Sequence, residues 1–184
     1  MRKLIIPILL VLTFLSSMGN AESITVSQTM QGLTAMEWFD KAYALWDGNK
    51  FTSPKKAIEY LSNAINLKPN LDAAYLYRGI AYSALGQYKR AIEDFNGVIR
   101  LKPDCAEVYL SRGMAYSALG QKQRAIKDYN VAIRLDPDFA RAYVHRGLAY
   151  IITGDGYGCL DVKKACELGH CEGYDLVKKK GICP

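Results

Sequence analysis

The sequence predicts an all-α fold, a right-handed superhelical solenoid of about four helix-turn-helix units closed by a C-terminal capping helix. Segments 72–105 and 106–139 align without gaps and are identical at 21 of 34 positions. Each segment holds two apolar stretches with helical periodicity. Gly86-Gln87 and Gly120-Gln121 separate the two stretches, and glycine commonly ends helices. Repeats of this length stack on their neighbours to bury a shared core, which makes a solenoid.

Residues 1–21 have the composition of a cleaved secretory signal peptide. Arg2 and Lys3 precede an apolar run from Leu4 to Leu15, and Gly19-Asn20-Ala21 places small residues before a cut at Glu22. The alternative is a membrane anchor, but about 12 apolar residues are fewer than the ~20 that span a bilayer. We therefore predict an exported protein, periplasmic or secreted, with no membrane span.

The remaining composition is that of an ordinary globular protein. The chain has 184 residues, 50% of them hydrophobic and 23% charged, and its formal net charge is +6. Lys and Arg are dispersed among 18 acidic residues, whereas nucleic-acid-binding proteins concentrate their basic residues on one surface. The sequence therefore predicts no nucleic-acid partner.

The first unit is predicted to follow a flexible segment, residues 22–33. Thr34 to Glu37 has the form of a capping box, and Ser53-Pro54 supplies a helix N-cap followed by proline at the first helical position. These signals place unit 1 at residues 34–70. Its turn, Asp47 to Ser53, holds about three residues more than the later turns.

Three more units follow in order. Units 2 and 3 cover residues 71–105 and 106–139, and Pro103 and Pro137 stop their second helices, because proline disfavours helical geometry in the residue before it. Unit 4, residues 140–168, keeps the first helix of the repeat but has a shorter turn and a degenerate second half. Residues 169–184 are predicted to form a C-terminal cap.

The period and the repeated residues resemble the tetratricopeptide repeat (TPR) family. The aromatic, glycine, tyrosine, alanine and proline positions of that family are occupied in unit 2 by Tyr75, Gly79, Tyr82, Ala91, Phe95 and Pro103, and in unit 3 by Tyr109, Gly113, Tyr116, Ala125, Tyr129 and Pro137. Unit 1 departs from the pattern, with Trp38 and Ala42 at the first two positions. The resemblance covers about residues 35–168 and implies a non-enzymatic scaffold or adaptor that binds a peptide or helix of another protein.

The resemblance also implies a binding surface, the concave groove that TPR first helices line. The matching positions here are mostly apolar, which favours a peptide or helix as the ligand. The candidate groove residues are Phe39, Tyr43, Trp46, Leu76, Ile80, Leu110, Met114, Val144, His145 and Leu148. Ser83, Glu107 and Arg141 occupy polar positions of the same stripe. The alternative is that the terminal helix or a second copy of the protein covers the stripe, so that the protein is a self-associating envelope component, a homodimer.

An arginine recurs at one position of units 2 to 4, where the family more often has an apolar residue. An aspartate recurs in the second helix of the same units, and unit 1 lacks both residues. We predict an ion pair within each helix hairpin rather than an anion-binding ladder. The pairs are Arg78 with Asp94, Arg112 with Asp128, and Arg146 with Asp161.

Four cysteines gather near the C-terminus, where export favours disulfides. Cys159 and Cys166 lie seven residues apart on one predicted helix, about 10 Å along its axis, beyond the roughly 7 Å limit for a bridge. A helix hairpin in this segment pairs Cys159 with Cys183 and Cys166 with Cys171. The alternative pairs Cys159 with Cys171 and Cys166 with Cys183. Cys105 is predicted to be a free thiol.

No convincing catalytic, cofactor or metal motif is present. The cysteine spacing lacks the paired C-x2-C knuckles of structural zinc sites. Ser53 to Lys56 matches the S-x-x-K motif of penicillin-recognising enzymes but has no S-D-N or K-T-G partner. Ala165 to Gly169 is similar to the repeat ends of cysteine-rich relatives linked with penicillin binding. A hydrolase of the β-lactamase type is therefore a remote alternative, and the sequence predicts no enzyme, no cofactor and no metal.

Overall fold

The computed structural model describes residues 32–183, so the predicted signal peptide and most of the predicted segment 22–33 lie outside the described residues. Within 32–183 the chain forms nine α-helices, and its only β-type pairing is an isolated bridge between Trp46 and Phe51. The helices are α2 (Ala35–Tyr43), α3 (Pro54–Leu67), α4 (Asp72–Ala84), α5 (Tyr88–Leu101), α6 (Ala106–Ala118), α7 (Lys122–Leu135), α8 (Ala140–Thr153), α9 (Gly158–Glu167) and α10 (Glu172–Lys179). The predicted all-α class is confirmed.

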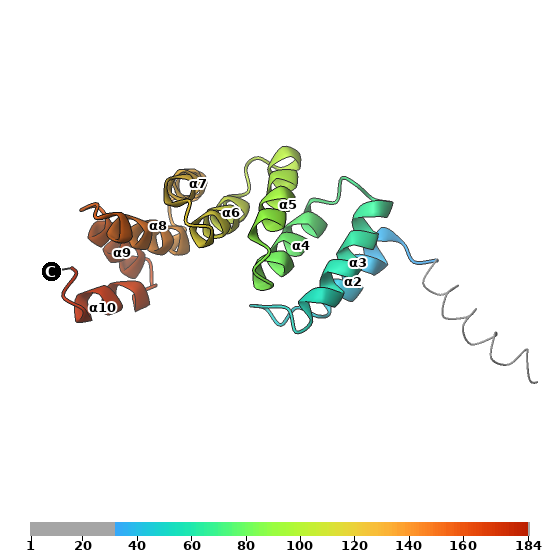
Figure 1. The fold of residues 1–184 in the computed structure, drawn as a ribbon, viewed down its shortest axis with the longest axis horizontal. Coiled ribbons are helices and arrows are strands. Elements are labelled where there is room, and N and C mark those ends of the chain that lie inside the picture. The colour runs from blue at the N-terminus through green and yellow to red at the C-terminus, as the bar shows by residue number, and fades with distance from the viewer. Residues whose placement is uncertain (1–31, 184) are drawn as a thin grey trace, which may run out of the picture.

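The helices form consecutive pairs that stack along the long axis of the molecule. Each pair, α2 with α3, α4 with α5, α6 with α7 and α8 with α9, packs against the next, and α10 closes the C-terminal end (Figure 1). The apolar core runs along this stack as four clusters that mostly join neighbouring pairs. This is the predicted solenoid with its capping helix.

The helix ends follow the sequence signals with one exception. Thr34 and Glu37 form the predicted capping box, in which the Thr34 hydroxyl accepts the Glu37 N–H at 3.2 Å and the Glu37 carboxylate accepts the Thr34 N–H at 2.7 Å. Gly86 and Gly120 take positive φ after α4 and α6. The exception is the Ser53 hydroxyl: Ser53 stands at the N-cap of α3 with Pro54 at the first helical position, as predicted, but its side chain makes no capping hydrogen bond.

The two helices of units 2 and 3 approach closely where a glycine faces a ring. A Cβ on Gly79 would lie 2.6 Å from the Cε1 atom of Phe95, and a Cβ on Gly113 would lie 2.5 Å from the Cε1 atom of Tyr129. Both rings are almost completely buried. The repeated glycines are therefore required by contact between the helices.

Each predicted arginine–aspartate pair is present and carries a further bond. In unit 3, Arg112 donates two hydrogen bonds to the Asp128 carboxylate, at 2.7 and 2.8 Å, and a third to the Asn96 side chain at 2.6 Å. Asn96 belongs to the second helix of the preceding unit. The same arrangement joins Arg78 to Asp94 and Ser62, and Arg146 to Asp161 and Asn130. The arginines therefore connect successive units as well as the two helices of one unit.

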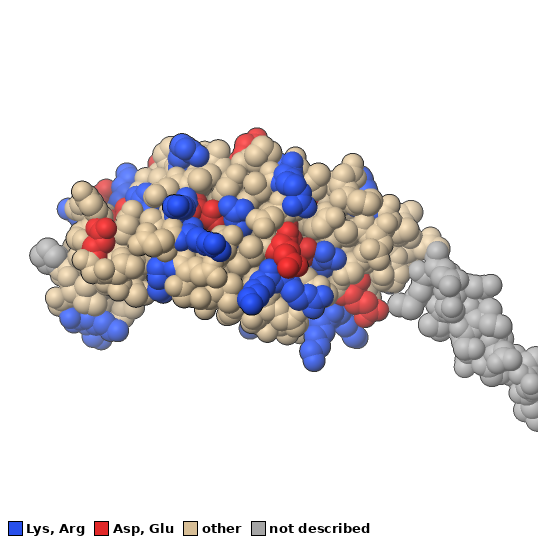
Figure 2. Space-filling model, turned by 45° about the horizontal axis from the view of Figure 1, so that its top comes forward, with Lys and Arg blue, Asp and Glu red and all other residues tan. Residues whose placement is uncertain are grey.

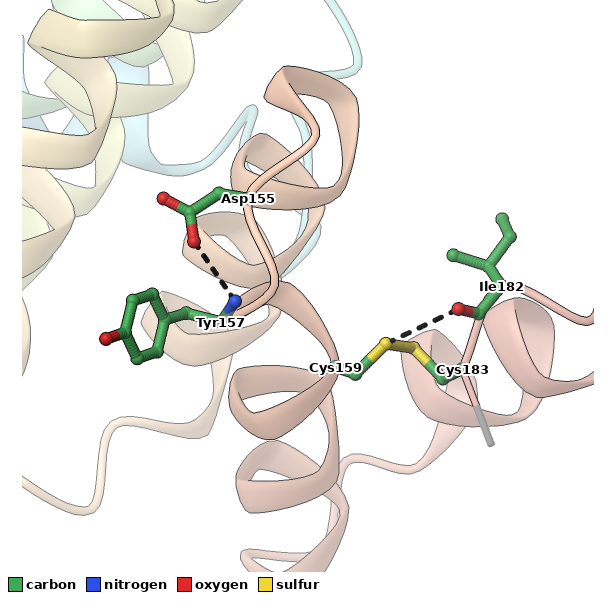
Figure 3. Close-up of a disulfide and its surroundings, with 5 residues drawn as sticks. All are labelled: Asp155, Tyr157, Cys159, Ile182 and Cys183. Carbon is green, nitrogen blue, oxygen red and sulfur yellow. Dashed lines mark hydrogen bonds between the residues drawn. A yellow bond between two sulfur atoms is a disulfide. The ribbon is translucent and has the colours of Figure 1, made fainter.

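Two disulfides hold the C-terminal cap. Cys159, in the first turn of α9, pairs with Cys183 beyond α10 (Figure 3), and Cys166 pairs with Cys171 across the α9–α10 turn. This is the first of the two pairings considered from the sequence. Cys105 is unpaired and half-buried at the start of α6.

Candidate functional site

The candidate site is an open groove of about 690 Å³ beside the first helices of units 2 to 4. Its lining is more apolar than polar and comes from α4, α5, α6, α8 and the turn after α2. The lining residues are Trp46, Gly48, Asn49, Ile80, Ser83, Tyr88, Phe95, Glu107, Ser111, Met114, Ala115, Ala118 and Arg141. A groove of this character suits a peptide with apolar side chains.

The N-terminal end of the groove is the long turn of unit 1. The Asp47 carboxylate accepts the N–H groups of Asn49 and Lys50 at 2.9 and 2.8 Å, and this bonding holds the turn. Those two bonds lower the pKa of Asp47, so the carboxylate stays charged and keeps its acceptor role. The rings of Trp46 and Phe51 pack edge to face at 5.0 Å across the turn. The long turn therefore forms one wall of the groove, through Trp46, Gly48 and Asn49.

The charged residues that line the groove, Glu107 and Arg141, lie at its opposite end. Arg141 on α8 donates to the Glu107 carboxylate on α6 at 3.1 Å, and both side chains are exposed. This single contact differs from the two-bond pairs of Arg78, Arg112 and Arg146, and exposed pairs contribute little to stability. Arg141 therefore keeps donors that a ligand can use.

Three of the predicted groove residues, Trp46, Ile80 and Met114, line this groove. Leu110 does not, because its side chain is completely buried in the core between α6, α7 and α8. Its position on the first helix faces the first helix of the next unit, where Ala142 belongs to the same cluster. Leu76 likewise packs into the core shared with α6. The assignment of Leu110 to an open groove is wrong, since packing between units uses that position.

Phe39 and Tyr43 belong to an aromatic cluster at the N-terminal end of the array. The Tyr43 and Tyr77 rings meet edge to face at 5.4 Å, and the Phe39 ring lies 5.8 Å from that of Tyr77. Burial, followed by the influence of Tyr43, raises the pKa of Tyr77. These rings fill the space between α2 and α4 and leave only Tyr43 well exposed.

The remaining predicted residues lie at the other end, where α8 meets the cap. Val144 and His145 line a second cavity of about 400 Å³ together with Arg141 and the turn into α10. Burial, and then the charge of Arg141, lowers the pKa of His145, which stacks on the Tyr129 ring at 6.0 Å. Leu148 packs against the apolar cluster of the cap. The structure therefore divides the predicted stripe into an aromatic end, a central groove and a capped end.

Sequence reasoning missed the groove residues contributed by other elements. Asn49 comes from the long turn, and Tyr88 comes from α5, a second helix. Phe95 of α5 also borders the groove, but its ring is almost completely buried against Gly79. The extra length of the turn was a usable signal for Asn49. No pattern in the sequence indicates that α5 reaches the groove, because the TPR resemblance assigns groove residues to the first helices alone.

On the face shown in Figure 2, Lys and Arg are scattered and interspersed with acidic side chains. In residues 32–183 there is no group of three or more His, Cys, Asp and Glu side chains arranged to hold a metal ion. Across the same residues, no helix is both long enough and apolar enough to cross a bilayer.

Comparison with known proteins gives a consistent result for the fold. The Tetratricopeptide repeat family profile matches residues 39–106, 76–138 and 110–155. A crystal structure of MamA is 27% identical, covers 80% of this chain and 80% of that chain, and superposes with a TM-score of 0.68. A thermophilic TPR protein of Thermus thermophilus is 19% identical over 81% of this chain and 84% of that chain, with a TM-score of 0.68.

A third solved structure is the first TPR of Spaghetti bound to the HSP90 peptide SRMEEVD. It is 21% identical, covers 66% of this chain and 94% of that chain, and has a TM-score of 0.62. Among curated protein sequences, none matches this chain. The overlapping profile matches run from residue 39 to residue 155, most of the helical array, and on that ground the chain belongs to the tetratricopeptide repeat family.

Proposed function

We propose that the protein is an exported, non-enzymatic scaffold or adaptor that binds a peptide or helix of another protein in its concave groove. The observation that carries the proposal is the open groove itself, where Trp46, Ile80 and Met114 present apolar surface on successive units. Met114 is 38% exposed although it sits among buried neighbours. Exposed apolar surface in a groove favours a partner that covers it.

A related fold supports this choice of ligand. The first TPR of Spaghetti was solved with a peptide bound, which demonstrates that a TPR domain of similar fold holds a short peptide. The groove here differs in chemistry, since its only lining charges are Glu107 and Arg141. An apolar segment with a polar group near Arg141 is the ligand that this lining favours.

Export is the second part of the proposal. Its support is the signal-like composition of residues 1–21 and the two disulfides of the cap, because structural disulfides persist in oxidising compartments. The absence of catalysis is the third part. Its support is that Ser53, the one nucleophile with a motif, starts α3 beside Pro54 without its S-D-N and K-T-G partners.

The test is capture of a partner from envelope extract with the immobilised protein and a groove variant. Met114→Glu places a charge in the groove without entering the core, since Met114 is partly exposed. Met36→Glu is the matched control, because Met36 is exposed to a similar extent on α2 and does not line the groove. The proposal predicts a partner retained by the wild type and by Met36→Glu but lost by Met114→Glu.

Two results would count against the proposal. Equal retention by all three proteins would mean that the groove is not the binding surface. A stable dimer in light scattering that dissociates only on Met114→Glu would favour self-association, the competing function.

A further inference from the structure

Two apolar side chains stand out where α9 begins. Tyr157 and Leu160 are 66% and 63% exposed, among the highest values for the large hydrophobic side chains of residues 32–183. We call them the α8–α9 patch. Single exposed apolar residues are common on soluble proteins, but a local group of them indicates an interaction surface.

The earlier units provide an internal comparison for this patch. At the position of Leu160, directly before the paired aspartate, units 2 and 3 have Glu93 and Lys127. At the position of Tyr157 they have Arg90 and Arg124. Both positions are therefore more apolar in unit 4 than in units 2 and 3.

The side-chain geometry supports this equivalence. Arg90 and Arg124 lie over the rings of Tyr82 and Tyr116, with the guanidinium carbon 4.2 and 5.7 Å from the ring centroids. Tyr157 takes the same place against Tyr150, with the ring centroids 6.4 Å apart. An apolar ring thus replaces a charged group at one solvent-exposed site, where neither residue is needed for the core.

Two lysines extend the patch along the outer face of α9. Residues three and four apart on a helix are surface neighbours, so Lys163 and Lys164 lie next to Leu160, which in turn lies next to Tyr157. The buried face of α9 is made by other residues, Gly158, Asp161, Val162 and Ala165. Of the nearby acidic groups, Asp155 accepts the Tyr157 N–H at 3.1 Å within the turn, and Glu167 lies one turn beyond Lys163 and Lys164 on α9, on the side away from Tyr157.

This surface is separate from the groove and from the disulfide-bonded cap. No residue of α9 lines the groove. Figure 3 shows the Tyr157 side chain directed to the side of the α9 start opposite the Cys159–Cys183 bridge and α10. A ligand on the α8–α9 patch therefore leaves the groove open.

We propose that the α8–α9 patch docks the protein on an anionic lipid surface. Tyrosine with aliphatic side chains, flanked by lysines, is the combination found where proteins contact the boundary between acyl chains and headgroups. Lys163 and Lys164 complement negatively charged headgroups. Two apolar side chains are far fewer than the roughly 20 to 30 residues per side of a stable protein interface, which disfavours a second copy as the occupant.

The experiment is sedimentation of the purified, disulfide-bonded protein with phosphatidylcholine vesicles, with and without phosphatidylglycerol. The protein is expected to pellet with the anionic vesicles only, and added salt is expected to release it. Leu160→Glu and the double variant Lys163→Glu, Lys164→Glu are each expected to lower the partition coefficient about tenfold or more. All these positions are exposed, so circular dichroism is expected to show an unchanged fold.

Matched controls lie on the cap. Leu176 is an exposed leucine of α10, and Lys178 and Lys179 are exposed lysines of the same helix. Leu176→Glu and the double variant Lys178→Glu, Lys179→Glu are expected to bind the anionic vesicles as the wild type does. Because the vesicles contain no peptide, the outcome is independent of the proposed groove function.

Three outcomes would overturn the proposal. The first is no binding to anionic vesicles. The second is an equal loss of binding in the α9 and α10 variants, which would show attraction to basic charge in general. The third is a protein that copurifies with the wild type and is lost on Leu160→Glu while vesicles are not bound, which would make the α8–α9 patch a protein-binding surface instead.

Discussion

Arg112 makes three hydrogen bonds with two different helices, and this arrangement recurs in three units of the array. The bond to Asp128 holds the hairpin of one unit, and the bond to Asn96 reaches the preceding unit. The Asp128 hydrogen bond is the main cause that raises the pKa of Arg112. A guanidinium with its planar donors is suited to this double role, which a lysine would not fill.

Removal of one partner from this arrangement has a predictable cost. Asp128→Ala leaves the half-buried Arg112 charge without its carboxylate and is expected to lower the free energy of unfolding by about 3 kcal/mol. Asn96→Ala removes one bond and is expected to cost about 1 kcal/mol. Urea unfolding measures both changes. If both variants lower the free energy of unfolding by the same small amount, the arginine–aspartate pairs contribute no more to stability than the exposed Arg141–Glu107 pair.

His145 makes stability depend on mildly acidic pH. Burial, and then the Arg141 charge, lowers its pKa from the ordinary value of 6.5, so the unfolded chain takes up a proton at higher pH than the folded one. The stabilising contribution is present above pH 6.5 and is lost as the pH falls below that value. The melting temperature of the wild type is expected to fall more than that of His145→Gln between pH 7.5 and 5.5. Parallel pH profiles for the two proteins would contradict this account.

At the scale of one helix pair, close contact between helices depends on the repeated glycines. Gly113→Ala places a Cβ 2.5 Å from the buried Tyr129 ring and is expected to destabilise the protein by about 2 kcal/mol. Gly156→Ala is the control, since a Cβ there meets nothing within 4 Å and Gly156 is not among the glycines with positive φ. Thermal unfolding compares the two variants. Similar melting temperatures would mean that the helices separate without cost.

The cap is the element that depends most on covalent bonds. Within α10 only Val177 is buried, and an isolated helix of this length is unstable in water. Loss of the Cys159–Cys183 bridge by double serine substitution is expected to cost about 3 kcal/mol, and loss of the shorter Cys166–Cys171 loop about 2 kcal/mol. Amide hydrogen exchange of residues 172–183 reports the change. Unchanged protection after loss of both bridges would show that apolar packing alone holds the cap.

At the scale of the whole molecule, the repeat made most of the fold predictable. The 34-residue period located the helix pairs, and the co-occurrence of arginine and aspartate predicted contacts 15 or 16 residues apart. The groove was less predictable, because the side that a helix position faces depends on its neighbours. An apolar residue at position 110 suits a contact with a ligand as well as the contact with Ala142 that the structure shows. The sequence alone therefore does not tell which contact Leu110 makes.

One groove residue that the sequence missed comes from a second helix. Tyr88 reaches the groove from α5, which packs against both α4 of its own unit and α6 of the next unit. The angle between successive units arises from this packing, and no local sequence pattern encodes it. The repeat shows that Tyr157 and Leu160 replace charged residues of units 2 and 3, but it does not show that their side chains are exposed. The α8–α9 patch depends on that exposure, which only the structure gives.

Peptide binding in the groove is the central claim, and site-specific photo-crosslinking in the living cell tests it most directly. A photoreactive amino acid at Ser83, which lines the groove, is compared with the same amino acid at Met36, which does not. The account predicts an adduct with another protein from Ser83 and none of the same mass from Met36. An adduct of Ser83 with a second copy of the chain, or the absence of any adduct, would contradict it.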